Sequence, residues 1–153
     1  MKGKIIGGSA ASVLVLALAL VKPWEGYATE PYIDIVGVAT YCYGDTGPHE
    51  QRKYGEQECA AKLNSRLGQY LTGISGCINR PMREREWAAV LSFSYNVGVS
   101  ATCRSTMVRR INDGEVGPGW CAELSKWVYA GGKRVKGLVN RRAAERKLCE
   151  GRS

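Results

Sequence analysis

The sequence is poor in residues that bind metal ions. It contains a single histidine, His49, and its six cysteines lie far apart without any Cys-x-x-Cys pair. Because a zinc site needs closely grouped Cys or His ligands, a metal centre is not expected. An even number of widely spaced cysteines instead favours disulfides in an oxidising compartment, and the alternative is a set of buried free thiols. The cysteines are Cys42, Cys59, Cys77, Cys103, Cys121 and Cys149.

Acidic residues are also scarce relative to basic ones. The 153-residue chain has 22 Lys and Arg against 14 Asp and Glu, which gives a formal net charge of +8. Its length allows one compact domain with a hydrophobic core, and its 44% of apolar residues excludes a largely disordered chain. A basic surface favours a polyanion, which could be nucleic acid, anionic lipid or an acidic cell-wall polymer. Charge alone does not choose among them.

Long apolar runs are missing except at the N-terminus. Residues 5–21 carry no charge, and they follow Lys2 and Lys4 and end at Lys22. This length lies at the bottom of the range of about 17–25 residues that spans a bilayer core. The two early lysines favour an N-terminus in the cytoplasm, with the rest of the chain outside.

Three interpretations compete for this segment: a cleaved signal peptide, a permanent anchor, and a weak segment that is retained and can leave the membrane again. Ala17-Leu18-Ala19 is a poor cleavage site because the apolar run continues beyond it. A permanent anchor would be longer and contain fewer Gly, Ala and Ser residues. We therefore favour the third interpretation, with residues 1–22 as a separate segment and residues 23–153 as the folded domain.

A β-hairpin is predicted after this segment. Strand-forming residues dominate residues 32–43, and Gly37 interrupts them. With a three-residue loop centred on Gly37, Asp34 and Thr40 lie directly opposite each other and share one face. A two-residue loop would shift this pairing.

Two carboxylates near the hairpin suggest glycoside hydrolysis. That chemistry needs one carboxyl group that stays protonated and donates to the leaving oxygen, and one that stays ionised. Glu25, beside Trp24 at the end of an apolar helix, is the better candidate for the acid, whereas Asp34 on a solvent-facing hairpin should be charged. Spacing alone is a weak signal, since surface carboxylates usually serve only solubility.

Longer motifs strengthen this interpretation. Glu25, Asp34 and Thr40 match the E-x8-D-x5-T pattern of the phage-type lysozymes, the endolysins that degrade host peptidoglycan. The segment EGYATEPYIDIVGVATYCYGDTG resembles the active-site segment of that family. LSFSYNVG (91–98) resembles its mid-chain helix motif, and WVYAGGKRVKGLVNRRAAE (127–145) resembles its C-terminal signature. Together these motifs span most of residues 24–149 in the family's order.

The resemblance implies an α+β fold in which a small sheet lobe and a larger helical lobe are joined by a long helix, expected near residues 56–71. It also implies cleavage of the β-1,4 bond between N-acetylmuramic acid and N-acetylglucosamine, without a metal or organic cofactor. Glu25 would be the general acid, Asp34 the second catalytic carboxylate and Thr40 a group that holds the attacking water. Such a water implies inversion, with the two acids roughly 6.5–9.5 Å apart.

The resemblance also carries expectations for supporting residues. Arg141 falls where the family places an arginine behind the catalytic acid, so we expect a Glu25–Arg141 pair. Asp45 stands where many relatives have histidine, which we interpret as a changed supporting salt bridge. The sequence leaves disulfide connectivity open; the pairs we expect are Cys42–Cys59, Cys77–Cys103 and Cys121–Cys149.

The membrane segment adds a hypothesis of control. Four residues separate Val21 from Glu25, so a bilayer that holds residues 5–21 also holds Glu25 near its surface. No cysteine lies in residues 1–41 to control activity by thiol chemistry, so membrane tethering is the simpler hypothesis. The expected partners are peptidoglycan and, before release to the periplasm, the inner membrane. The enzyme should be a monomer that does not bind nucleic acid.

Two alternatives remain open from the sequence. A lytic transglycosylase also uses a glutamate on a lysozyme-like fold, but it forms a 1,6-anhydro sugar and does not need Asp34 and Thr40 to direct water. A basic, non-enzymatic protein that binds membrane or nucleic acid would explain the charge and residues 1–22. It would leave the E-x8-D-x5-T spacing accidental.

Overall fold

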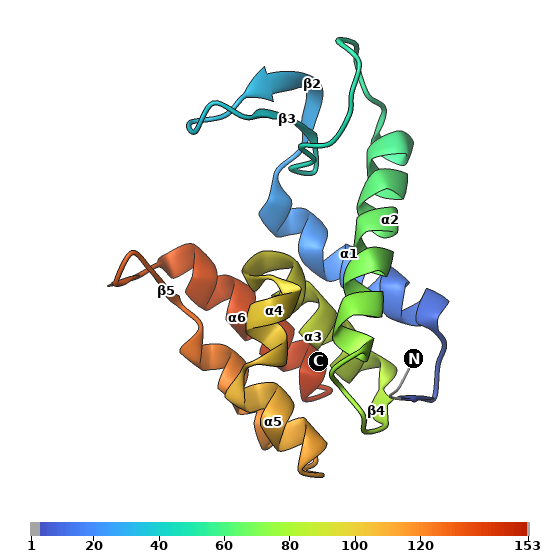
Figure 1. Cartoon of the computed structure of the whole chain (residues 1–153), viewed down its shortest axis with the longest axis vertical. Coiled ribbons are helices and arrows are strands. Elements are labelled where there is room, and N and C mark those ends of the chain that lie inside the picture. Colours follow the sequence, from blue (N-terminus) through green and yellow to red (C-terminus); the bar gives the residue numbers. More distant parts are fainter. Residues whose placement is uncertain (1–3, 153) are drawn as a thin grey trace.

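The computed structural model describes residues 4–152 and has two lobes joined by one long helix (Figure 1). The small lobe contains an antiparallel pair of strands, β2 (Ala28–Ile33) and β3 (Ala39–Cys42). Helix α2 (Glu56–Ser75) runs from this lobe into the larger one, as predicted for the bridging helix.

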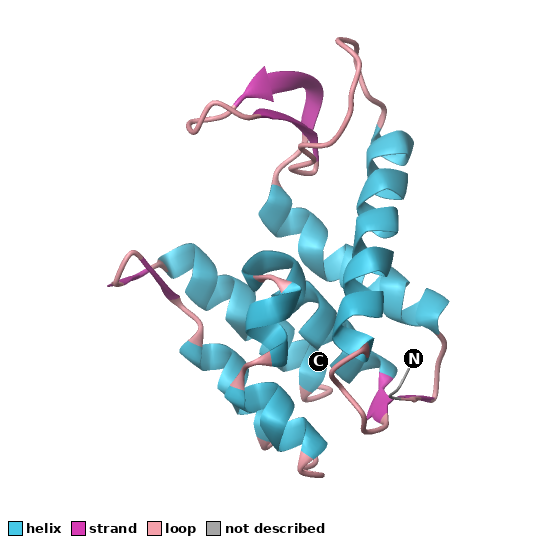
Figure 2. Ribbon diagram, viewed as in Figure 1, coloured by secondary structure: helices cyan, strands magenta, loops and turns pink. Residues whose placement is uncertain are grey.

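Helices make up most of the larger lobe (Figure 2). In chain order they are α1 (Ala10–Glu25), α3 (Glu84–Val97), α4 (Val99–Cys103), α5 (Thr106–Asn112), the 3-10 helix η1 (Trp120–Lys126) and α6 (Lys136–Cys149). Two short strand pairs complete the described elements: β1 (Ile5–Ile6) with β4 (Met82–Arg83), and β5 (Tyr129–Ala130) with β6 (Lys133–Arg134). The predicted α+β architecture of a small sheet lobe and a larger helical lobe joined by a long helix is confirmed.

Helix α3 forms the centre of the core. It packs against α1, α2 and α6, and all its residues from 86 to 94 are buried. Trp87, Val90 and Leu91 are spaced as residues on one helix face, yet this helix is covered on every side. A helix surrounded in this way needs apolar or internally bonded side chains around its whole circumference. Ser94 fits because its hydroxyl donates to the carbonyl of Leu91 at 2.8 Å.

The N-terminal apolar segment lies on the body of the protein as helix α1. Ser9 and Ser12 cap its start with reciprocal side chain–backbone hydrogen bonds. Val13, Ala17 and Val21 follow at four-residue spacing and are fully buried, because side chains four positions apart share one helix face. The helix continues without interruption past residue 22 to Glu25.

Strand β1 fixes the start of this segment. The carbonyl of Lys4 accepts from the backbone N–H of Met82 at 2.9 Å and from the indole N–H of Trp87 at 3.1 Å. Lys2 lies outside the described residues. Within residues 4–152 no helix combines the length and the hydropathy needed to cross a bilayer.

Three disulfides connect elements that are distant in the sequence. Their pairs are Cys42–Cys59, Cys77–Cys103 and Cys121–Cys149, which are the expected pairs. All six cysteines are used, so the alternative of buried free thiols is wrong. The first bond ties β3 to α2, and the third ties η1 to α6.

The register of the β2–β3 hairpin differs from the prediction. Tyr32 lies opposite Thr40, and Asp34 lies opposite Val38, whose carbonyl accepts from the Asp34 N–H at 2.9 Å. The turn is therefore centred on Val36 and not on Gly37. Asp34 and Thr40 are diagonal neighbours on the same face, at the larger separation typical of such pairs. The expected direct cross-strand pair of Asp34 and Thr40 is wrong, although their shared face remains.

Candidate active site

Glu25 is the last residue of α1 and lies where the helical lobe meets the small lobe. Its side chain is 21% exposed, and its Oε1 accepts a hydrogen bond from Nη1 of Arg141 at 2.9 Å. The expected Glu25–Arg141 contact is therefore present. On the other side, a Cβ at Gly44 would lie 3.5 Å from Oε2, and Gly44 has a positive φ of 77°. Glycine suits both this backbone conformation and the close approach to the carboxylate.

Arg141 is held from behind by a buried group of polar side chains. Its own side chain is only 5% exposed, and its Nε lies 3.6 Å from Oε2 of Glu145, which is fully buried. The hydroxyl of Ser92 donates to the same Glu145 oxygen at 2.6 Å, and Nη1 of Arg142 lies 3.1 Å from Oε1. Burial raises the pKa of Glu145, while the two neighbouring guanidinium groups oppose that shift. This buried charged group lies directly behind the arginine that contacts Glu25.

The Asp34 carboxylate is bound by its own loop. Its Oδ1 accepts from the backbone N–H groups of Val36 and Val38, both at 2.9 Å. The Thr40 hydroxyl donates to the carbonyl of Val38 at 3.2 Å. Both of these bonds use Oδ1, which leaves Oδ2 as the oxygen that could hold a water. The loop thus fixes Asp34 and Thr40 relative to each other through Val38.

Asp45 does contribute to an ionic contact. It is 8% exposed, its Oδ1 accepts from the N–H of Gly47 at 2.8 Å, and the same atom lies 3.6 Å from Nη1 of Arg66. Its backbone also pairs with Tyr41 across a tight turn. These contacts support the turn that follows β3, which leads to Gly44 beside Glu25.

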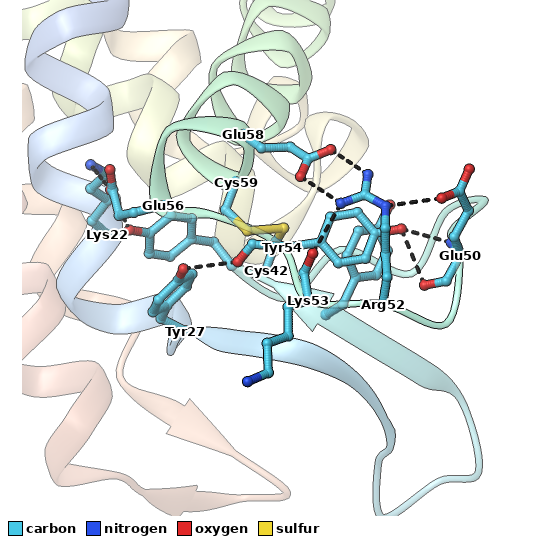
Figure 3. The surroundings of a disulfide bond; sticks show 12 residues. Lys22, Tyr27, Cys42, Glu50, Arg52, Lys53, Tyr54, Glu56, Glu58 and Cys59 are labelled. Atoms are coloured by element: carbon cyan, nitrogen blue, oxygen red, sulfur yellow. Dashed lines mark hydrogen bonds and ion pairs between the residues drawn. A yellow bond between two sulfur atoms is a disulfide. The ribbon is translucent and has the colours of Figure 1, made fainter.

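A second polar cluster, which was not predicted from the sequence, ties the end of α1 to the small lobe. Lys22 Nζ and the Tyr43 hydroxyl both donate to Oε1 of Glu56, at 2.8 and 2.7 Å. The Tyr27 hydroxyl donates to the carbonyl of Tyr54 at 3.2 Å. Figure 3 shows Lys22, Tyr27 and Glu56 around the Cys42–Cys59 disulfide. The cluster holds the turn of helix just before Glu25 against the start of α2.

Two hydrogen-bond donors stabilise the ionised form of Glu56. The hydrogen bond from Lys22, and after it that from Tyr43, lowers the pKa of Glu56. From the sequence alone, Lys22 is only the charged residue that ends the apolar segment. Its contact with Glu56 spans 34 residues, so no local sequence pattern could have predicted it.

Among residues 4–152 there is no group of His, Cys, Asp and Glu side chains suited to hold a metal ion.

Comparisons with known proteins agree on one family. The phage lysozyme family model matches residues 22–145. A SAR-endolysin of Bacteriophage PS119 is 42% identical over 149 residues, which cover 95% of this chain and 89% of that protein. A SAR-endolysin of Enterobacteria phage P21 is 41% identical, with 94% and 90% covered. The structure resembles an endolysin from Escherichia coli O157:H7 phage FAHEc1, with a TM-score of 0.75, 28% identity and coverage of 88% and 90%.

Proposed function

Since the chain belongs to the phage lysozyme family and is a glycoside hydrolase, a muramidase, we propose that it cleaves the β-1,4 bond between N-acetylmuramic acid and N-acetylglucosamine in bacterial peptidoglycan, with inversion. The observation that carries this proposal is the position of Glu25. It sits at the junction of the two lobes, partly exposed and fixed by a buried arginine. The basic chain would approach an anionic cell wall favourably.

In this proposal Glu25 protonates the leaving oxygen, and Asp34 with Thr40 directs a water to the opposite face of the sugar. The loop contacts that fix Asp34 and Thr40 around Val38 support such a role for the pair. Arg141 would position the acid and stabilise its anion after proton transfer. Positioning a general acid typically contributes about 10²–10⁴-fold to the rate.

The test is Glu25→Gln, with Glu30→Gln as the matched control, because Glu30 is an exposed carboxylate on β2. Glu25→Gln should lower wall cleavage by about 10²-fold or more, while Glu30→Gln should retain it. The proposal fails if Glu25→Gln stays active. Products should carry reducing ends of inverted configuration, which NMR detects early in the reaction. A 1,6-anhydro end would instead establish the transglycosylase alternative.

We also propose that residues 5–21 act as a signal-anchor-release segment. On this proposal they first tether the chain to the inner membrane and then release it to the periplasm. The relatives named SAR-endolysins support this, as does the modest apolar character of the segment. In its released state the segment would fold as α1 on α3, with Val13, Ala17 and Val21 buried. Docking would then bring Glu25 to Arg141.

Substitutions at two alanines can distinguish the effect of docking onto the body from the effect of leaving the membrane. Ala17 is fully buried against the body, whereas Ala19 is exposed. Ala17→Leu and Ala19→Leu add the same apolar surface to a membrane-embedded segment, but only the first crowds the core of the released protein. If docking activates the enzyme, Ala17→Leu should delay host lysis more than Ala19→Leu. Equal delays would mean that docking adds nothing to membrane exit.

A further inference from the structure

A second cavity, of about 500 Å³, lies in the helical lobe away from Glu25. Strand β4, the first turn of α3, the end of α5 and the loop before η1 form its walls. Figure 1 shows β4 near the foot of the molecule, while the β2–β3 hairpin lies at its top. None of the residues proposed for catalysis lines this cavity.

Glu86 places a buried carboxylate in the wall of this cavity. Glu86 is only 9% exposed, and its Oε2 accepts a hydrogen bond from the backbone N–H of Arg83 at 2.9 Å. That bond caps the start of α3, and the helix N-terminus favours a negative charge there. Oε1 points elsewhere: a Cβ on Gly117, another residue of the wall, would lie 3.3 Å from it.

No cation neutralises this carboxylate within the described part of the chain. The twelve ion pairs found there, at a limit of 4.0 Å, do not include Glu86. Capping accounts for only one of the two oxygens, and no hydrogen bond to Oε1 is found among the described residues. A cationic group that donates to Oε1 would neutralise the carboxylate.

Two arginines line the same cavity without contacting Glu86. Arg80 donates from Nε to the carbonyl of Asn112 at 3.2 Å, which holds its guanidinium at the cavity. Arg83 touches Glu86 only through its backbone. Neither arginine has a carboxylate partner among residues 4–152, whereas Glu115, the other acid of the wall, is paired with Arg110. The cavity wall therefore carries two arginines and the Glu86 carboxylate, which form no ion pair with one another.

We propose that this cavity binds an α-amino-acid zwitterion, with its ammonium at Oε1 of Glu86 and its carboxylate at Arg80 and Arg83. The volume lies within the range of roughly 300–1,000 Å³ found for small-molecule sites. A wall substrate offers such a group at the free end of diaminopimelate in its stem peptides. This choice of ligand rests on the proposed function; the zwitterion site itself does not.

The test is titration of the full chain with meso-diaminopimelate, observed by NMR at the indole N–H of Trp120, a buried residue of the cavity wall. Pimelate lacks both ammonium groups and 1,5-diaminopentane lacks both carboxylates, so each keeps half of the recognition. Meso-diaminopimelate should shift the Trp120 signal saturably, and both analogues should bind at least about tenfold more weakly. Equal binding of pimelate would reduce the site to an anion site on the arginines and overturn the proposal, as would the absence of any saturable shift.

Variants decide whether the side chains act as stated. Glu86→Gln keeps an oxygen that can cap α3 but removes the charge, and Arg83→Met keeps the backbone N–H bond to Glu86. Each should weaken binding at least about tenfold, whereas Arg104→Met, which changes an arginine outside the cavity, should not. Unchanged binding in Glu86→Gln overturns the proposal. Cleavage of peptide-free glycan chains is measured in parallel, because it tests the proposed function independently of this site.

Discussion

Replacing Glu145 by glutamine is the sharpest test of the support behind the candidate active site. Glu145 is fully buried and faces two guanidinium groups, those of Arg141 at 3.6 Å and Arg142 at 3.1 Å. The substitution keeps the size of the side chain and an acceptor for the Ser92 hydroxyl, which donates to Glu145 at 2.6 Å. It removes the negative charge and places an NH2 donor where one carboxylate oxygen faced a guanidinium group.

The expected loss is large because both arginines are also buried. Removing one partner of a buried ion pair typically costs about 3–5 kcal/mol, since the remaining charge has no partner. Native domains have a total stability of about 5–15 kcal/mol, so Glu145→Gln should bring the folded state close to its limit. Glu145→Leu combined with Arg142→Met replaces a pair by apolar groups, and such replacements are often neutral or stabilising.

Urea unfolding at pH 7 measures both effects. The single variants Glu145→Leu and Arg142→Met together with the double variant form a double-mutant cycle. A coupling free energy of about 2 kcal/mol or more is expected, with the double variant more stable than Glu145→Leu alone. Additive losses, or a Glu145→Gln variant as stable as the native chain, would refute the idea that this group acts as one unit.

Three further predictions concern other elements. Replacing Cys77 and Cys103 by alanine opens a link across 26 residues and should cost about 3.5 kcal/mol in the chain-entropy relation, seen as a lower urea midpoint. The hydrogen bond from Lys126 lowers the pKa of Glu123 below its usual 4.5. The ionised Glu123 therefore stabilises the folded state above that pH, and this stabilisation is lost as the pH falls through the folded-state pKa. The midpoint of thermal unfolding should fall below about pH 4.5, and it should fall less in Glu123→Gln. Gly37→Ala should cost about 1–2 kcal/mol, because Gly37 has a φ of 83° and open space around it, so only backbone strain acts; an unchanged urea midpoint would contradict that reading.

Much of the architecture was predictable because its determinants are local. Leu63 and Leu67 stand four positions apart and are buried in the bridging helix that the resemblance implied, and the strand formers with Gly37 indicated the hairpin. The resemblance placed Glu25 and Arg141 together across 116 residues, which no local pattern could do.

The hairpin register was predicted wrongly because side-chain chemistry decided it. The Asp34 carboxylate accepts two loop N–H groups, from Val36 and Val38, and this closes the turn around Val36. Gly37 then provides the positive φ at the end of the turn and not at its centre. Asx-type contacts of this kind compete with the pairing that a simple strand pattern suggests.

The charge run near the C-terminus shows the limit of composition as a guide to burial. Residues 141–147 have the composition of a solvated helix face, yet Arg141, Arg142 and Glu145 are buried. Their partners Ser92 and Asn96 come from α3, so only the packing of two distant helices reveals the network. The cavity at Glu86 could not be predicted either, because its walls come from three separate parts of the chain: Ile6, residues 80–86 and residues 111–120.

The carbonyl oxygen of Lys4, which accepts hydrogen bonds from Met82 and Trp87, bears on the order in which the chain folds. Its hydrogen bond with Trp87 spans 83 residues, whereas α3, α4 and α5 contact their sequence neighbours. Contacts across long stretches of chain form late, because they first require the closure of a large loop. The helical lobe is therefore expected to assemble before its own N-terminus joins it. Glu25 ends the N-terminal helix, and its hydrogen bond with Arg141 spans 116 residues, so folding order by itself postpones the completion of the candidate active site.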